Sequence, residues 1–218
     1  MKKVIFDTDI GIDDAMALLF LHHAPDVDLI AITTGFGNAS VSNTTRNALY
    51  MKELFNMSAA VYAGAATPVG SALGEGYADF VHGKNGLGDI PITTPMCEAE
   101  AMPAAEAIVE LVRANPHALS VVAVGRMTNL AMALALDPEL PSLVKELIVM
   151  GGVFGYNGHR GNVSPVAEAN IAGDPLAADR VFSSGIPTTI VGLDVTAETV
   201  MNEAYIDQLR QSAGASGE

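Results

Sequence analysis

Residues 4–15 read VIFDTDIGIDDA, and the rest of the fold can be predicted outward from this stretch. Its β-branched and aromatic start predicts a short buried strand, Gly11 predicts a turn, and the apolar spacing of residues 16–21 predicts a buried helix. Four aspartates therefore lie where a strand ends and a helix begins, with no Lys or Arg among them. Like charges this close repel strongly in a partly dry cleft, so a cation must balance them or some must be protonated. A hard divalent ion bound by carboxylate oxygens is the simplest answer.

Strand-like and helical runs alternate along the rest of the chain. Further strands are expected at residues 27–33, 60–63, 119–124, 147–150 and 188–192. Helices are expected at residues 42–55, 103–114, 130–136 and 175–184, and again after residue 196. Such alternation implies right-handed crossovers and a mainly parallel open sheet with helices on both faces, which is a Rossmann-like α/β fold. We expect a single domain over residues 1–218, because no shift in composition divides the chain.

The composition excludes several classes of partner. The chain has 25 acidic and 11 basic residues, a net charge of −14 and no basic run, which makes nucleic acid and anionic membrane surfaces poor partners. No apolar stretch reaches the roughly 18 residues that a transmembrane helix needs. Cys97 is the only cysteine, which excludes an intrachain disulfide and a zinc site built on cysteines, so a reducing cytoplasm is expected.

Most of the polar residues that could do chemistry follow a predicted strand. Because the carboxyl ends of parallel strands meet at one edge of a sheet, we expect these residues to converge there. Taken singly, Asp13 or Asp14 could cap the first helix, and Thr128 could cap a later one. Asn38 is by default a turn residue, and a histidine in a glycine-rich loop, such as His82, is more often exposed. Taken together, the carboxylates, threonine and carboxamides instead fit a hard oxygen-ligated ion and a polyhydroxylated substrate.

Residues 7–15, DTDIGIDDA, resemble the signature of the inosine-uridine-preferring nucleoside hydrolases. The resemblance continues in the same order through GN at 37–38, HGKNGL at 82–87, VGRMTNLA at 124–131, GNV at 161–163, AEAN at 167–170 and GLDVT at 192–196. It implies the nucleoside hydrolase fold and a calcium-dependent enzyme of purine and pyrimidine salvage. Such an enzyme cleaves the N-glycosidic bond of ribonucleosides to give ribose and free base. The resemblance also implies a homodimer or homotetramer.

The same resemblance assigns roles to the residues of the first motif. Asp9, Asp14 and the backbone carbonyl of Thr128 would hold Ca²⁺. Asp13 would be the general base that takes a proton from a calcium-bound water. Asp7 would orient the loop from behind these residues.

A second group of residues would contact the nucleoside, again by resemblance. The side chains that would hold the ribose hydroxyls are Asn38, Asn162, Glu168 and Asn170. His82 would lie near the base. Water would attack the sugar directly while the ribose develops oxocarbenium character, so no covalent intermediate between sugar and enzyme is implied.

The chain departs from the family pattern at a few points. Arg126-Met127 stand where the family more often has Pro-Leu, and Ala169 stands where an aromatic residue is common. The chain is also shorter than family members. The part expected to be absent, the C-terminal third, supplies a further aspartate ligand and, in many members, a histidine that acts as the acid. One alternative is therefore a catalytically incomplete domain that only binds nucleosides or a partner subunit.

A second alternative is a Mg²⁺-dependent phosphohydrolase with Asp7 as the nucleophile and Asp9 as the acid. An Asp-x-Asp pair that follows a first strand fits that class as well. The alternative leaves Asp13-Asp14 and the AEAN element at 167–170 unexplained, so nucleoside hydrolysis is the preferred prediction.

Overall fold

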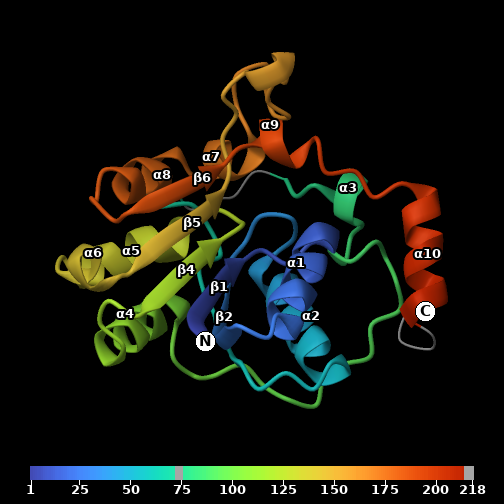
Figure 1. The fold of residues 1–218 in the computed structure, drawn as a ribbon. Helices are drawn as coiled ribbons and strands as arrows, with labels where there is room; N and C mark the ends of the chain where they lie inside the picture. The colour runs from blue at the N-terminus through green and yellow to red at the C-terminus, as the bar shows by residue number, and fades with distance from the viewer. Residues whose placement is uncertain (72–75, 214–218) are drawn as a thin grey trace.

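The computed structural model describes residues 1–71 and 76–213 of the chain (Figure 1). At its centre, six parallel strands form one sheet in the order β3-β2-β1-β4-β5-β6. The strands are β1 Lys2–Thr8, β2 Val27–Thr34, β3 Ala60–Ala63, β4 Leu119–Ala123, β5 Glu146–Met150 and β6 Thr188–Val191. The order reverses between β1 and β4, the point at which sheets of this type bind ligands at their carboxyl edge. The predicted parallel α/β fold is confirmed.

Helices cover both faces of this sheet. The longer ones are α1 Ile12–His23, α2 Val41–Leu54, α4 Ala104–Ala114, α5 Thr128–Leu136, α8 Pro175–Phe182 and α10 Glu203–Ala213. Figure 1 shows α1 and α2 on one side of the sheet and α4, α5 and α8 on the other. Neighbouring residues of β1 divide between the two cores, because side chains alternate along a strand. Phe6 belongs to the core that includes Leu18 of α1, and Ile5 to the core that includes Ile108 of α4. Of the described helices, none is both long and apolar enough to cross a membrane.

The segments predicted as loops contain short helices that the sequence did not indicate. These are α3 Asp79–His82, α6 Leu140–Leu143, the 3₁₀ turn η1 Tyr156–Gly158, α7 Ala169–Gly173 and α9 Leu193–Thr196. Each is too short for a periodic apolar pattern to identify it. Most other boundaries agree with the prediction within one or two residues, although the last helix begins at Glu203 and not directly after residue 196.

Candidate active site

Asp9 lies at the carboxyl edge of the sheet, pressed between the loops that follow β2 and β4. A Cβ atom on Gly125 would lie 2.7 Å from Asp9 Oδ1, and one on Gly37 would overlap Asp9 Oδ2. Glycine is required at both positions, because a real Cβ atom does not approach other heavy atoms so closely. The backbones of both loops therefore lie against the Asp9 carboxylate, and this carboxylate is buried.

Asn38 bridges the two buried carboxylates of the motif. Its backbone N–H donates to Asp9 Oδ2 and its side-chain Nδ2 donates to Asp14 Oδ2, each at 2.8 Å. Asp14 Oδ2 also accepts from the N–H of Gly11 at 2.7 Å, so this carboxylate does cap the start of α1. Capping does not account for the whole cluster. Asp9 Oδ1 and Thr8 Oγ1 are buried and have no hydrogen-bond partner within the part of the chain that the structure describes.

Burial makes the charged forms of these carboxylates unfavourable. It raises the pKa of Asp9 to about 7 and holds the pKa of Asp14 well above its usual range, where the charge of Asp9 adds to the effect. Over residues 1–71 and 76–213, no group of three His, Cys, Asp or Glu side chains is arranged to hold a metal ion. Asp9 and Asp14 nevertheless supply carboxylate oxygens, which a hard divalent ion prefers as ligands, and Asp9 Oδ1 has no hydrogen-bond partner among the described residues. The residues present therefore fit part of a Ca²⁺ ligand set.

Asp7 lies behind this cluster and faces the interior. Its Oδ1 accepts from Thr33 Oγ1 at 2.6 Å and from Asn129 Nδ2 at 2.9 Å, which ties β1 to β2 and to α5. Burial raises the pKa of Asp7 to about 6. A nucleophile must face its substrate, whereas this side chain is buried and held by other side chains. This geometry favours the predicted role of Asp7 behind the cluster over the alternative in which it is a phosphohydrolase nucleophile.

Asp13 differs from its neighbours because its carboxylate is open to solvent. Its side chain is 83% exposed, and Oδ1 lies 3.9 Å from His82 Nδ1. The same Nδ1 accepts from the N–H of Ile12 at 3.3 Å. His82 is buried, contrary to the expectation for a histidine in a glycine-rich loop, and its ring lies against the backbone of Gly11, where a Cβ atom would be 2.6 Å from Nδ1. Burial lowers the pKa of His82, so an uncharged ring stands beside an exposed carboxylate.

Thr128 does not cap α5. It is the first residue of that helix, and its hydroxyl donates to Asp174 Oδ2 at 2.7 Å instead of to its own helix. Gly125, three residues earlier, abuts Asp9, so the start of α5 lies at the same edge as the carboxylate cluster. This placement is compatible with the predicted role of the Thr128 carbonyl as a ligand.

Glu168 has a structural role that the sequence did not reveal. It caps α7, and its two carboxylate oxygens accept from the backbone N–H groups of Gly152, Asn170 and Ile171 at 2.8–3.1 Å. The side chain is buried. Ser, Thr, Asp and Asn are the preferred capping residues, so a glutamate gave no signal of a cap.

Asn170 and Asn162 also direct their side chains to backbone groups. Asn170 Nδ2 donates to the carbonyls of Val124 at 2.8 Å and Met150 at 3.1 Å, and so joins the ends of β4 and β5. Asn162 Oδ1 accepts from the N–H of Ala169 at 2.9 Å, and this residue is exposed. The structure thus brings Asn38 and Asn170 to the edge that carries Asp9, with Asn162 farther out on the loop.

Two buried aspartates of this edge were not predicted. Asp174 accepts from Thr128 and from the N–H of Val69, and Asp194 accepts from the N–H of Phe154 at 2.9 Å. Both hold loops in place. An Asp-Pro pair commonly begins a helix, and Asp174 followed by Pro175 was the available signal for the first of them.

Known proteins match this chain over most of its length. The family model described as inosine-uridine preferring nucleoside hydrolase matches residues 4–218. The chain belongs to this family. The chain is 40% identical over 214 residues to uridine nucleosidase 1 of Arabidopsis thaliana, which covers 98% of the chain and 62% of that relative. It is also 40% identical over 206 residues to the non-specific ribonucleoside hydrolase RihC of Salmonella paratyphi A, which covers 94% of the chain and 66% of that protein.

Solved nucleoside hydrolase structures share the fold. The purine-preferring ribonucleoside hydrolase from Gardnerella vaginalis superposes with a TM-score of 0.94 at 36% identity, over 99% of this chain and 68% of that one. The chain therefore spans a little under two thirds of the length of its curated plant relative and a similar share of the solved structure.

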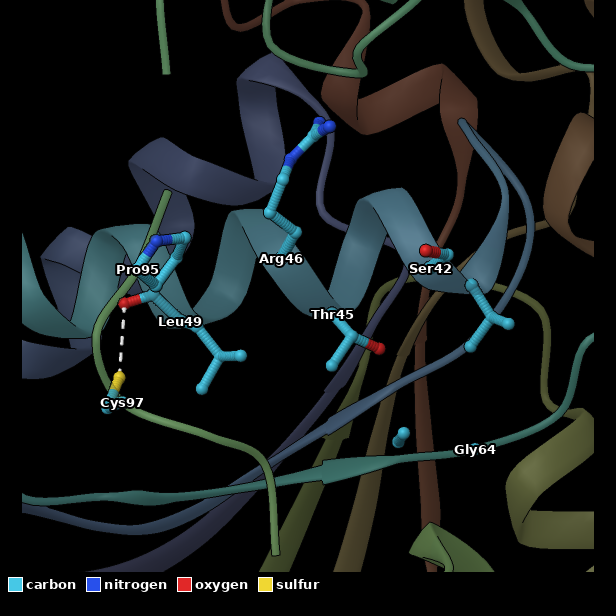
Figure 2. A pocket seen from close by; sticks show the side chains of 9 residues that line it. Ser42, Thr45, Arg46, Leu49, Gly64, Pro95 and Cys97 are labelled. Atoms are coloured by element: carbon cyan, nitrogen blue, oxygen red, sulfur yellow. Dashed lines mark hydrogen bonds between the residues drawn. The ribbon is translucent and has the colours of Figure 1, made fainter. Parts of the chain in front are cut away.

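One cavity of this nucleoside hydrolase family member lies apart from the carboxylate cluster. It measures about 350 Å³ and is formed by α2, the end of β3 and residues 95–97, as Figure 2 shows. The described residues that line it include none of the predicted site residues. Cys97 lines it, with Sγ 3.8 Å from the Leu49 carbonyl, and burial raises the pKa of this thiol. We place the candidate site at the carboxylate cluster, where buried polar atoms converge, and not at this cavity.

Proposed function

We propose that this chain carries the calcium site and the nucleoside site of a hydrolase that splits ribonucleosides into ribose and free base. The observation that carries the proposal is the Asp9–Asn38–Asp14 bridge, which holds two buried carboxylates together and leaves one Asp9 oxygen unpaired. Family membership supports the reaction class. The names of the relatives range from uridine through non-specific to purine-preferring, so we propose ribonucleosides as a class and not one base.

Asp9, Asp14 and the backbone carbonyl of Thr128 would hold the ion. When bound, Ca²⁺ would supply positive charge that lowers the pKa of a neighbouring water and attracts sugar hydroxyls. Asn38 would orient the two carboxylates for the ion, because its backbone N–H donates to Asp9 and its side-chain amide donates to Asp14.

Asp13 would take the proton of the attacking water. Its exposed carboxylate suits a general base, whereas Asp9 and Asp14 are buried and hydrogen-bonded. The water oxygen forms a bond to the anomeric carbon, the C–N bond breaks, and its electron pair leaves with the base. Negative charge at the carboxylate cluster favours the oxocarbenium character of the ribose in the transition state.

The substrate would lie along the carboxyl edge of the sheet. Its ribose would meet the side chains of Asn38, Asn162, Glu168 and Asn170. Asn170 uses its amide hydrogens on two carbonyls, so its Oδ1 is the atom available to a sugar hydroxyl. His82, with its lowered pKa, would meet the base as an uncharged ring. The homo-oligomer and the cytoplasmic location stay predictions.

A binding domain without catalysis is the second candidate. One observation favours it: within the described residues, no third acidic or histidine side chain joins Asp9 and Asp14 in a metal-holding group. Purified chain is titrated with calcium chloride and assayed for reducing sugar released from inosine and uridine, with Asp13→Asn as the matched control. Calcium binding with release of base that Asp13→Asn abolishes supports the hydrolase. Binding of calcium and ribose without release supports the binding domain and contradicts the hydrolase.

A further inference from the structure

Two Asn-Gly pairs occur in the chain, at residues 85–86 and 157–158, and the structure holds them very differently. An asparagine that precedes a glycine can lose its amide without an enzyme. The backbone nitrogen of the glycine attacks Cγ of the asparagine, so the two atoms must be free to approach each other. Each pair is therefore a candidate modification site, and the local packing decides between them.

The first pair, Asn85-Gly86, is fixed by hydrogen bonds and by packing. Asn85 Oδ1 accepts from the N–H of Leu87 at 2.8 Å, and its Nδ2 donates to the Ile90 carbonyl at 2.9 Å. A Cβ atom on Gly86 would lie 2.9 Å from Asn47 Nδ2, so the glycine backbone packs closely against another side chain. Attack by the Gly86 nitrogen would require several of these contacts to break together.

The second pair, Asn157-Gly158, is exposed and loosely held. It lies in the turn η1, on the loop that follows β5. Apart from its chain neighbours, a Cβ atom on Gly158 would meet no atom of the described residues within 4 Å, so the space around this glycine is open. Asn157 Nδ2 donates to Glu198 Oε1 at 3.3 Å, and the Gly158 N–H donates to the Gly155 carbonyl at 3.3 Å. Both bonds are long, so little holds the reacting atoms apart.

We propose that Asn157 is a site of spontaneous deamidation and that the carboxylate formed there releases its loop from Glu198. The Gly158 nitrogen forms a bond to Asn157 Cγ, and the bond between Cγ and Nδ2 breaks. The amide nitrogen leaves as ammonia, together with the proton of the Gly158 N–H. Water then opens the five-membered succinimide ring to give aspartate or isoaspartate. The net reaction consumes one water and exchanges a hydrogen-bond donor for a negative charge.

The new charge would act on a contact between two segments of the chain. Glu198 lies just beyond α9, and its Oε1 contacts His159 Nε2 at 2.9 Å and Asn157 Nδ2 at 3.3 Å. A carboxylate at residue 157 has no hydrogen to donate and repels Glu198, because both groups are anions. The loop of residues 153–163 would then lose one of its attachments. This loop also carries Asn162, a proposed contact of the ribose.

The first test follows deamidation by peptide mass mapping while the full chain is kept in mildly alkaline buffer. Conversion at Asn157 should be at least about tenfold faster than at Asn85, because Asn85 must first break additional hydrogen bonds. Asn56 is the matched control: it is exposed and has a positive φ of 50°, like the 53° of Asn157, but it precedes Met57. It should stay unconverted over the same time. Equal rates at Asn157 and Asn85, or a faster rate at Asn85, would overturn the proposal.

The second test measures the loop itself by its cleavage with trypsin after Arg160. Asn157→Asp should be cut there about two to five times faster than freshly prepared wild type, because a like-charge pair at an exposed contact has a modest effect. Adding Glu198→Gln to Asn157→Asp exchanges donor and acceptor and should return the cleavage rate toward that of the wild type. Asn56→Asp places the same charge on the turn after α2 and should leave the rate unchanged.

Both tests are made without substrate or calcium, so their outcomes are independent of the proposed function. Faster cleavage of Asn157→Asp that Glu198→Gln reverses would support release of the loop by charge repulsion. A cleavage rate that Asn157→Asp does not raise, or that Glu198→Gln does not lower again, would overturn that release.

Discussion

Two regions of the carboxyl edge use their polar side chains in opposite ways. After β1 and β2, Asp9, Asp14 and Asn38 contact one another and leave a buried carboxylate oxygen unpaired. After β5, Glu168 and Asn170 direct their hydrogen bonds to backbone groups of the surrounding loops and strands. The first arrangement is typical of a ligand site, and the second is typical of a scaffold that shapes a loop. Substitutions in the two regions should therefore affect different properties.

The largest expected effect follows from Asp13→Ala in the first region. Because a general base contributes about 10²- to 10⁴-fold to the rate, kcat for inosine and uridine should fall by that factor. The side chain is 83% exposed, so the urea midpoint should stay unchanged. Asp179→Ala, an exposed aspartate on α8, is the control and should keep full activity. Activity within tenfold of the wild type would remove Asp13 from the chemistry.

Glu168→Gln should lower stability as well as weaken the proposed contact with ribose. The carboxylate accepts three backbone N–H groups, and an amide retains one acceptor oxygen, so buried donors lose their partners. We expect a loss of about 1–3 kcal/mol in the free energy of unfolding, measured with urea, and little change in the calcium Kd. Glu106→Gln, at an exposed position on α4, is the matched control. A stable Glu168→Gln protein that no longer binds calcium would place Glu168 in the same functional region as Asp9.

A smaller effect is expected from pH in metal-free protein. In the unfolded chain Asp9 loses its proton near pH 4, whereas burial raises its folded pKa to about 7 and that of Asp7 to about 6. Unfolded protein therefore binds fewer protons between these values, and the stability of the folded state falls as the pH rises from about 4 to 7. Urea midpoints after calcium removal should be higher at pH 5 than at pH 8, and added calcium should raise the midpoint more at pH 8. Midpoints that rise with pH in metal-free protein would contradict the raised pKa values.

Much of the first region could be predicted because its signals are local. The strand, the glycine turn and the apolar period of α1 lie next to one another in the sequence, so Asp9 and Asp14 could be placed at the end of β1. The contact with Asn38 could not be predicted in detail, because it depends on the register of β1 against β2 and on the close approach of Gly37.

Contacts that join distant segments of the chain were harder to predict. Thr128, taken singly, could have capped its own helix, but its hydroxyl donates to Asp174, a residue far along the chain. Arg126 follows Gly125 at the end of β4, and only the pairing of β4 with β1 brings this part of the chain to the edge that carries Asp9. Burial of His82 likewise depends on the close approach of its ring to the backbone of Gly11, which no apolar pattern reveals.

The central claim is that the Asp9–Asn38–Asp14 arrangement is a calcium site, and calorimetric titration of wild type and Asp9→Asn with calcium chloride tests it most directly. An asparagine oxygen can still accept a hydrogen bond from the Asn38 N–H, so the variant should fold. Since the substitution removes a buried charge, the urea midpoint of the metal-free variant at pH 8 should be at least as high as that of the wild type. We predict that the wild type binds one ion per chain and that Asp9→Asn binds at least about a hundredfold more weakly. Absence of binding by the wild type, or equal affinity in a folded Asp9→Asn protein, would contradict the claim.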